Sequence, residues 1–185
     1  LWFRRIPRLP NCRKNPCVAV LEGHTDCIHG ALALVSGQIL SWSDDMTLRL
    51  WDDRSGKCVE VLKGHTCWVR GALSLANGKI VSWAKTAVWS RDTMIRVWDA
   101  SDGRCLRVLK GHTQEICGVL ELADGRLLSW SEDCNLRVWD SHTGVCLLVL
   151  AGHTHRVRGA MKLPEGRVLS WSDLENVLRI WDTST

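Results

Sequence analysis

The sequence predicts an all-β protein built from four copies of one antiparallel unit. Two short motifs recur in register: Gly-His-Thr begins at residues 23, 64, 111 and 152, and Trp-Asp begins at residues 51, 98, 139 and 181. In every copy a glycine, a serine and a tryptophan follow the histidine by 13, 17 and 18 residues. This strict spacing over a unit of about 42 residues indicates a repeat architecture, and no window shows helical periodicity.

The third copy shows how one unit divides into strands. Asp124-Gly125 predicts a type I′ hairpin turn, whose two central residues both need positive φ. A second turn is predicted at 131–134, and the polar, glycine-ending stretch at 141–144 predicts a third. The apolar segments between these turns predict four strands, at 105–109, 116–122, 126–131 and 135–139.

One such sheet cannot bury enough apolar surface to be stable alone. Sheets that pack face to face around an axis bury both faces and leave only short edges, as in a β-propeller. We therefore expect a β-propeller of four-stranded antiparallel blades, present as a partial ring or as half of a larger ring. The predicted divisions are a basic leader or remnant of a preceding repeat at 1–16 and repeats at 17–57, 58–104, 105–145 and 146–185.

Composition narrows the class of protein. Of 185 residues, 45% are apolar and 24% are charged, which is typical of a globular domain. A net charge of +4 is too small to indicate a nucleic-acid or membrane partner, and no apolar run reaches the ~18 residues of a membrane span. The leader lacks the apolar stretch of a secretory signal. We expect a cytoplasmic protein without membrane contact, and disfavour nucleic acid as a partner.

Cysteine usage follows the repeat. Of nine cysteines, four occupy one repeated position: Cys17, Cys58, Cys105 and Cys146. Equivalent positions in neighbouring sheets lie about 10 Å apart, too far for a disulfide. We interpret these cysteines as small buried hydrophobic residues in a reducing compartment, in preference to disulfides or a metal site, and no C-x-x-C pair occurs.

The four Gly-His…Trp-Asp units resemble the WD-repeat β-propeller family over residues 17–185, and their close mutual similarity resembles bacterial members. The resemblance implies an offset, in which each repeat supplies the outermost strand of one blade and the three inner strands of the next. The segment 17–21 would then be an unpartnered outer strand, and the chain would end at 181–182 before another one. These two ends are complementary, as ring closure requires.

The resemblance also implies a buried hydrogen-bond network in each blade. The histidine would contact a serine hydroxyl and a hairpin aspartate, and the serine would accept the indole N–H of the Trp-Asp tryptophan. Buried groups of these types need such partners. The implied sets are His24, Ser41, Asp45 and Trp51; His65, Ser82, Asp92 and Trp98; His112, Ser129, Asp133 and Trp139; and His153, Ser170, Asp173 and Trp181.

Two copies depart from the pattern. The second carries a six-residue insertion near 83–88; if the strand slipped by these residues, Val88 would replace Ser82 and the network would be lost. The fourth carries one extra residue between its two tryptophans, which predicts a bulge. Its carboxylate could then be Glu175 in place of Asp173.

No constellation predicts catalysis, a cofactor or a metal. A recurring His-Ser-Asp set suggests a structural role, because an enzyme needs one activated nucleophile and not four. The four histidines belong to different blades, and His153 with His155 would supply only two ligands. The repeated strand arginines are interpreted as an outward-facing, solvated row: Arg49, Arg96, Arg137 and Arg179.

The positions that vary most between copies predict a binding surface. They follow Gly-His-Thr or precede the hairpin carboxylate, and by the resemblance they lie on one face around the central channel. Trp68 with Arg70, and Arg156 with Arg158, are of the types enriched at binding hot spots. The candidate partner-binding residues are His29, Trp68, Arg70, Arg91, Glu115, Glu132, His155, Arg156 and Arg158.

These observations predict a non-catalytic scaffold or sensor that binds other proteins, as part of a larger signalling or regulatory protein. The alternative is a binder of nucleic acid or another anionic ligand through the arginines and the basic leader, which a steep salt dependence would reveal. Four repeats are few for a ring of this type, so we favour a segment of a longer chain. The alternatives are a homo-oligomer, if the four repeats are the whole chain, and a four-bladed ring.

Overall fold

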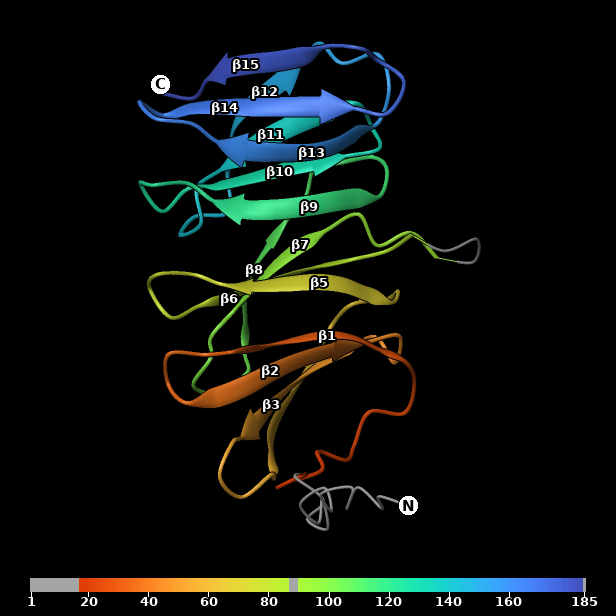
Figure 1. The fold of residues 1–185 in the computed structure, drawn as a ribbon, viewed down its shortest axis with the longest axis vertical. Coiled ribbons are helices and arrows are strands. Elements are labelled where there is room, and N and C mark those ends of the chain that lie inside the picture. The colour runs from red at the N-terminus through yellow and green to blue at the C-terminus, as the bar shows by residue number, and fades with distance from the viewer. Residues whose placement is uncertain (1–16, 87–89, 185) are drawn as a thin grey trace, which may run out of the picture.

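The computed structural model describes residues 17–86 and 90–184, which form four antiparallel sheets, here called blades 1 to 4, stacked along the long axis of the molecule (Figure 1). Blade 1 contains β1 (Ile28–Ala33), β2 (Gln38–Ser43), β3 (Thr47–Asp52) and β4 (Cys58–Lys63). Blade 2 contains β5 (Val69–Ser74), β6 (Ile80–Ala84), β7 (Ile95–Trp98) and β8 (Cys105–Leu109). Blade 3 contains β9 (Ile116–Glu121), β10 (Leu127–Ser131), β11 (Asn135–Trp139) and β12 (Cys146–Ala151). Blade 4 contains β13 (Val157–Lys162), β14 (Arg167–Ser172) and β15 (Leu178–Asp182).

The predicted all-β fold of antiparallel blades is confirmed. The described residues contain no helix, and therefore no helix that is long and apolar enough to span a membrane. In blades 1 to 3 the three inner strands come from one repeat and the outermost strand from the next, so the implied offset is present.

The stack is open. The segment 17–21, expected to be an outer strand, forms no strand, because no described strand lies beside it to share backbone hydrogen bonds. It lies at one end of the stack and β15 at the other (Figure 1). A closed four-bladed ring, one of the arrangements considered from the sequence, is therefore not what these residues form.

The hairpin at Asp124-Gly125 forms, but not with the predicted turn type. Leu122 accepts a backbone hydrogen bond from Gly125 at 3.1 Å and donates one to Arg126 at 2.7 Å. Gly125 has a φ of 81°, whereas Asp124 has no positive φ. This is a type I turn followed by a left-handed glycine, the geometry of a longer hairpin loop, and it explains why a glycine recurs at this position.

Both irregular repeats place their extra residues in loops. In blade 2 the strand does not slip: Ser82 pairs with Arg96 just as Ser41 pairs with Arg49, and the insertion extends the loop between β6 and β7. Val88 lies outside the described residues. In blade 4 the predicted bulge is wrong, because β14 and β15 pair without a register shift and the extra residue enlarges the 173–177 loop.

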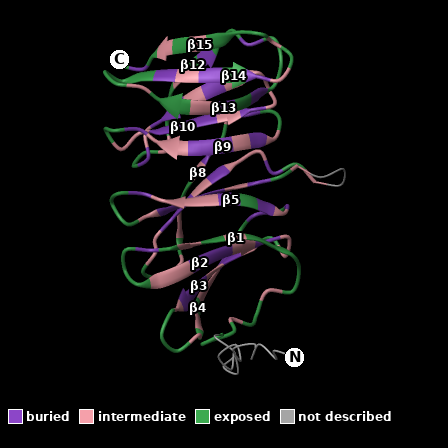
Figure 2. Cartoon of the chain, in the orientation of Figure 1, coloured by how far each residue is buried: buried purple, intermediate pink, exposed green. Residues whose placement is uncertain are grey.

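The hydrophobic core lies between successive blades. Each cluster combines the inner strands of one blade with the facing strands of the next, so the stack has one apolar layer at each of its three junctions. Figure 2 shows this burial in the middle of the stack and a more exposed last blade. Leu178 and Ile180 of β15 are 66% and 61% exposed, whereas their counterparts in β11, Leu136 and Val138, are fully buried.

A glycine in the first strand of each blade allows a tryptophan ring to lie across the sheet. In blade 3, Gly118 pairs with Trp130, and a Cβ built on Gly118 would lie 2.2 Å from the ring carbon Cζ2. No real Cβ makes so close a contact, so only glycine leaves room for the ring. The same contact recurs at Gly30, Gly71 and Gly159. The sequence reasoning missed this glycine, although it stands at the same distance from every Gly-His-Thr histidine.

Two expectations about the repeated arginines and cysteines are wrong. Arg49 is half-buried, with its guanidinium 6.0 Å from the Trp51 ring and its NH1 3.7 Å from Cys58 Sγ, so it stacks within the blade. Of the eight cysteines in the described part of the chain, Cys67 alone is buried. Cys58, Cys105 and Cys146 lie on outer strands, where the blade has no further described strand to cover them, and Cys17 lies on the segment that forms no strand.

Candidate functional site

A chain of hydrogen bonds crosses each blade from a tryptophan to a carboxylate. In blade 3 the indole Nε1 of Trp139 donates to Ser129 Oγ at 2.8 Å, and Ser129 Oγ lies 2.7 Å from His112 Nε2. His112 Nδ1 lies 2.7 Å from Asp133 Oδ2. The matching chains are Trp51, Ser41, His24 and Asp45 in blade 1, and Trp98, Ser82, His65 and Asp92 in blade 2, with separations of 2.7 to 2.8 Å.

In blade 4 the carboxylate is Glu175 and not Asp173. Trp181, Ser170 and His153 occupy their expected places, and His153 Nδ1 hydrogen-bonds Glu175 Oε2. Counted back from the tryptophan, Glu175 stands where aspartate stands in the other repeats, because the extra residue lies before it. Asp173 instead forms ion pairs with Arg156 and Arg158.

The two ends of the hydrogen-bond chain have fixed directions. An indole N–H can only donate and an ionised carboxylate can only accept, so the serine oxygen accepts from the tryptophan and the histidine Nδ1 donates to the carboxylate. When the ring carries no second proton, Nε2 accepts the serine O–H.

Burial and hydrogen bonding agree with this order. Burial lowers the pKa of His65 below its ordinary 6.5, and the neighbouring Asp92 only partly offsets that effect. Burial by itself would raise the pKa of Asp45, but hydrogen bonds from Thr47, His24 and the backbone of Thr25 outweigh it and lower the pKa to about 2. These directions favour an ionised Asp45 in blade 1 and an uncharged His65 in blade 2 near neutral pH.

The carboxylate also fixes the two loops beside it. Asp133 Oδ2 accepts the Thr113 backbone N–H at 3.0 Å, and Asp133 Oδ1 accepts the Asn135 backbone N–H at 3.0 Å. One side chain therefore holds both the Gly-His-Thr corner and the hairpin loop before the third strand. These two segments carry the variable positions.

We call the surface formed by these segments in the four blades the loop face; it lies on the right-hand side of Figure 1. Within each blade, the backbone N–H that follows the second strand donates to the carbonyl that precedes the first strand. The pairs are Asp44 and Cys27 (2.9 Å), Lys85 and Trp68 (2.8 Å), Glu132 and Glu115 (2.9 Å), and Asp173 and Arg156 (3.3 Å). The variable side chains of one repeat are thus brought together.

The candidate residues of blades 3 and 4 are largely paired with one another. Arg156 reaches both Asp173 of its own blade and Glu132 of blade 3, the latter at 3.2 Å, and Arg158 Nε lies 2.5 Å from Asp173. Glu115 accepts a hydrogen bond from Thr86 of the enlarged blade 2 loop at 3.3 Å. His155 and Arg156 line a cavity of about 420 Å³ between these blades.

Blade 2 presents a different surface. Trp68 is half-buried, while Arg70 and Arg91 are exposed. Among the described residues, no carboxylate lies within ion-pair reach of either arginine. In blade 1, His29 Nε2 lies 2.5 Å from Asp44 Oδ1. Of the arginines among the predicted contact residues, Arg70 and Arg91 are therefore the ones without an ion pair in the described part of the chain and the most available to an acidic partner.

Comparisons with known proteins support this architecture. A profile of the WD domain, G-beta repeat matches residues 15–52, 56–99 and 103–140, more than half of the chain. No curated protein matches by sequence. Among solved structures, the WD40 β-propeller domain of Doa1 is similar with a TM-score of 0.72 at 23% identity, over 88% of this chain and 53% of that one. The chain thus spans about half the length of that propeller and shares its fold.

Proposed function

Because the chain belongs to the WD40 repeat family, whose propellers generally act as non-catalytic protein-interaction scaffolds, we propose that it is a protein-binding module that presents its loop face to a partner. The proposal rests on the difference between constant and variable positions within each repeat. The tryptophan, serine, histidine and carboxylate are held constant in type and geometry, while the residues that differ are gathered on one surface.

The anchor of this surface is blade 2. Trp68, Arg70 and Arg91 combine an aromatic side chain with two exposed cations on a rigid framework. Tryptophan and arginine are over-represented among residues that dominate binding energy. The arginines of blade 4, by contrast, already neutralise Asp173 and Glu132. The partner that fits is a protein segment carrying acidic residues beside an apolar side chain.

The test uses a photo-crosslinking amino acid at position 70, on the loop face, and at position 104, in the turn at the opposite end of blade 2. A partner should be captured from position 70 and not from position 104. With that partner purified, Trp68→Ala should raise Kd by roughly 30-fold, since a central aromatic contact contributes about 2 kcal/mol. Arg70→Glu should weaken binding further, while the matched Arg104→Glu should leave Kd unchanged.

A partner that crosslinks equally at both positions, or that binds Trp68→Ala and Arg70→Glu as well as the parent chain, would exclude the loop face as its site. Thermal unfolding of each variant separates lost binding from lost fold.

The cellular setting and the class of partner are proposed from the same observations. A scaffold of this kind fits within a larger signalling or regulatory protein in the cytoplasm, with other proteins as partners. Binding of nucleic acid or another polyanion is disfavoured because the strand arginines are half-buried and the blade 4 arginines are paired. A loss of affinity by several decades between low and moderate salt would reverse that preference.

A further inference from the structure

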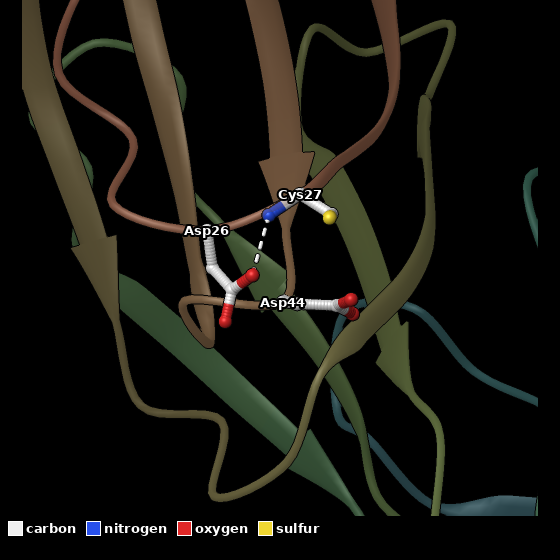
Figure 3. Close-up of side chains that lie close together, drawn as sticks. All are labelled: Asp26, Cys27 and Asp44. Carbon is white, nitrogen blue, oxygen red and sulfur yellow. Dashed lines mark hydrogen bonds between the residues drawn. The ribbon is translucent and has the colours of Figure 1, made fainter.

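The variable positions of blade 1 gather metal-binding side chains. Asp26 and Cys27 lie on the segment that enters β1, and Asp44 lies on the loop that leaves β2 (Figure 3). One carboxylate oxygen of each aspartate and the Cys27 Sγ all lie within 4.8 Å of one another. The backbone bond from Asp44 to Cys27, at 2.9 Å, holds the two segments together.

A fourth donor adjoins the group. His29, on β1, places its Nε2 2.5 Å from Asp44 Oδ1. Its side chain is 31% exposed and that of Asp44 is 15% exposed, so the pair lies at the surface but is partly shielded. The three close ligand atoms are those of Asp26, Cys27 and Asp44, and His29 adjoins them through its contact with Asp44.

This set is specific to blade 1. The matching residues are Cys67, Trp68, Arg70 and Lys85 in blade 2; Gln114, Glu115, Cys117 and Glu132 in blade 3; and His155, Arg156, Arg158 and Asp173 in blade 4. In blade 3, burial and the charges of Glu132 and Glu115 raise the pKa of the Cys117 thiol to about 12, which keeps it protonated and a poor ligand.

The charges at the matching positions also differ between blades 1 and 4. In blade 4, Asp173 is neutralised by Arg156 and Arg158. Among the described residues, no lysine or arginine forms an ion pair with Asp26 or Asp44. Two carboxylates thus lie close together beside a thiol, and a cation would relieve their repulsion.

We propose that Asp26, Cys27, His29 and Asp44 form a Zn²⁺ site on the loop face. Thiolate sulfur, imidazole nitrogen and carboxylate oxygen are the ligands that zinc prefers, and four of them complete a tetrahedron. Zinc–ligand bonds of 2.0–2.3 Å place tetrahedral ligand atoms about 3.3–3.7 Å apart. The three atoms within 4.8 Å need only small side-chain rotations, whereas the exposed His29 ring must turn from Asp44 toward Asp26 and Cys27 as zinc replaces the proton between His29 and Asp44.

Binding releases protons, because zinc requires the Cys27 thiolate and the unprotonated His29 nitrogen. The bound ion joins the Gly-His-Thr corner of blade 1 to its hairpin loop. This goes beyond partner binding through blade 2 and does not depend on it.

The test titrates the purified chain with zinc alone under reducing conditions, and then with Co²⁺ as a spectroscopic substitute. We expect one metal ion per chain and a thiolate-to-cobalt charge-transfer band in the near ultraviolet. Cys27→Ser should abolish that band, and both Cys27→Ser and Asp44→Asn should raise the zinc Kd by about tenfold or more. The matched variants Cys105→Ser, on an outer strand, and Glu132→Gln, at the Asp44 position of blade 3, should bind as the parent does.

Absence of stoichiometric binding in the parent chain would overturn the proposal. So would a cobalt band that survives Cys27→Ser, since the ion would then be held elsewhere. Because Asp26 and Cys27 are exposed, the variants are expected to fold, and unchanged thermal unfolding without metal verifies this.

Discussion

Trp139→Ala is expected to lower the free energy of unfolding by about 3–5 kcal/mol, the range for deleting a large buried aromatic side chain. Trp139 is 1% exposed and packs in the cluster between blades 2 and 3, against residues such as Ile116 and Leu127. Its removal also takes the indole donor from Ser129 Oγ. The loss therefore combines a cavity at a blade junction with a broken hydrogen-bond chain.

Trp171→Ala provides the control. Trp171 is the Ser-Trp tryptophan of the last blade and is 38% exposed, so its removal should cost about 1 kcal/mol or less. Urea unfolding followed by circular dichroism, which does not depend on the deleted fluorophore, measures both changes. Equal losses in the two variants would contradict the assignment of the core to the blade junctions.

Gly118→Ala is expected to destabilise the fold by about 1–3 kcal/mol, although alanine is normally the better strand residue. The reason is steric: the new methyl group would lie 2.2, 2.7 and 2.9 Å from three carbon atoms of the Trp130 ring. The backbone at Gly118 is an ordinary strand, so no positive φ contributes.

A double variant isolates this cause. In a Trp130→Ala background the ring is absent, so Gly118→Ala should cost several-fold less than it does alone. Urea unfolding of the four chains completes the cycle. If Gly118→Ala is as costly without the ring as with it, the clash is not the explanation.

The repeat predicted the fold because its spacing fixes which residues can meet. Histidine and serine stand 17 residues apart in all four copies, and this constant separation across one hairpin carries Ser129 to His112 and Ser82 to His65. The insertion in blade 2 lies outside that interval. The strand there consequently keeps its register and its network.

The carboxylate of blade 4 could not be chosen from the sequence alone. Asp173 lies three residues after Ser170, one fewer than the four that separate serine and aspartate in blades 1 and 3, whereas Glu175 keeps the spacing from the tryptophan. The decision depends on side-chain reach and on Arg156 and Arg158, which draw Asp173 away. The availability of the candidate contact residues also depends on such pairings, which are set by neighbouring blades and not by position in the repeat.

The proton order in the network sets how acid acts on the fold. The folded-state pKa of His65 is lowered, so the unfolded chain binds that proton more readily and stability falls as the pH drops from 6.5 toward the folded value. The folded-state pKa of Asp45 is about 2 against an ordinary 3.8, so its contribution is complete above 3.8 and is lost as the pH falls toward 2.

The most direct test of the network is the tautomer of its histidines, read by nitrogen NMR of the imidazole rings at neutral pH. An unbroken chain from tryptophan to carboxylate requires neutral rings with the proton on Nδ1 and a bare Nε2 facing the serine, and for His65 it requires titration below pH 6.5. A proton on Nε2, or a doubly protonated His65 at neutral pH, would make Nε2 a donor to the serine and contradict the proposed order of the hydrogen bonds.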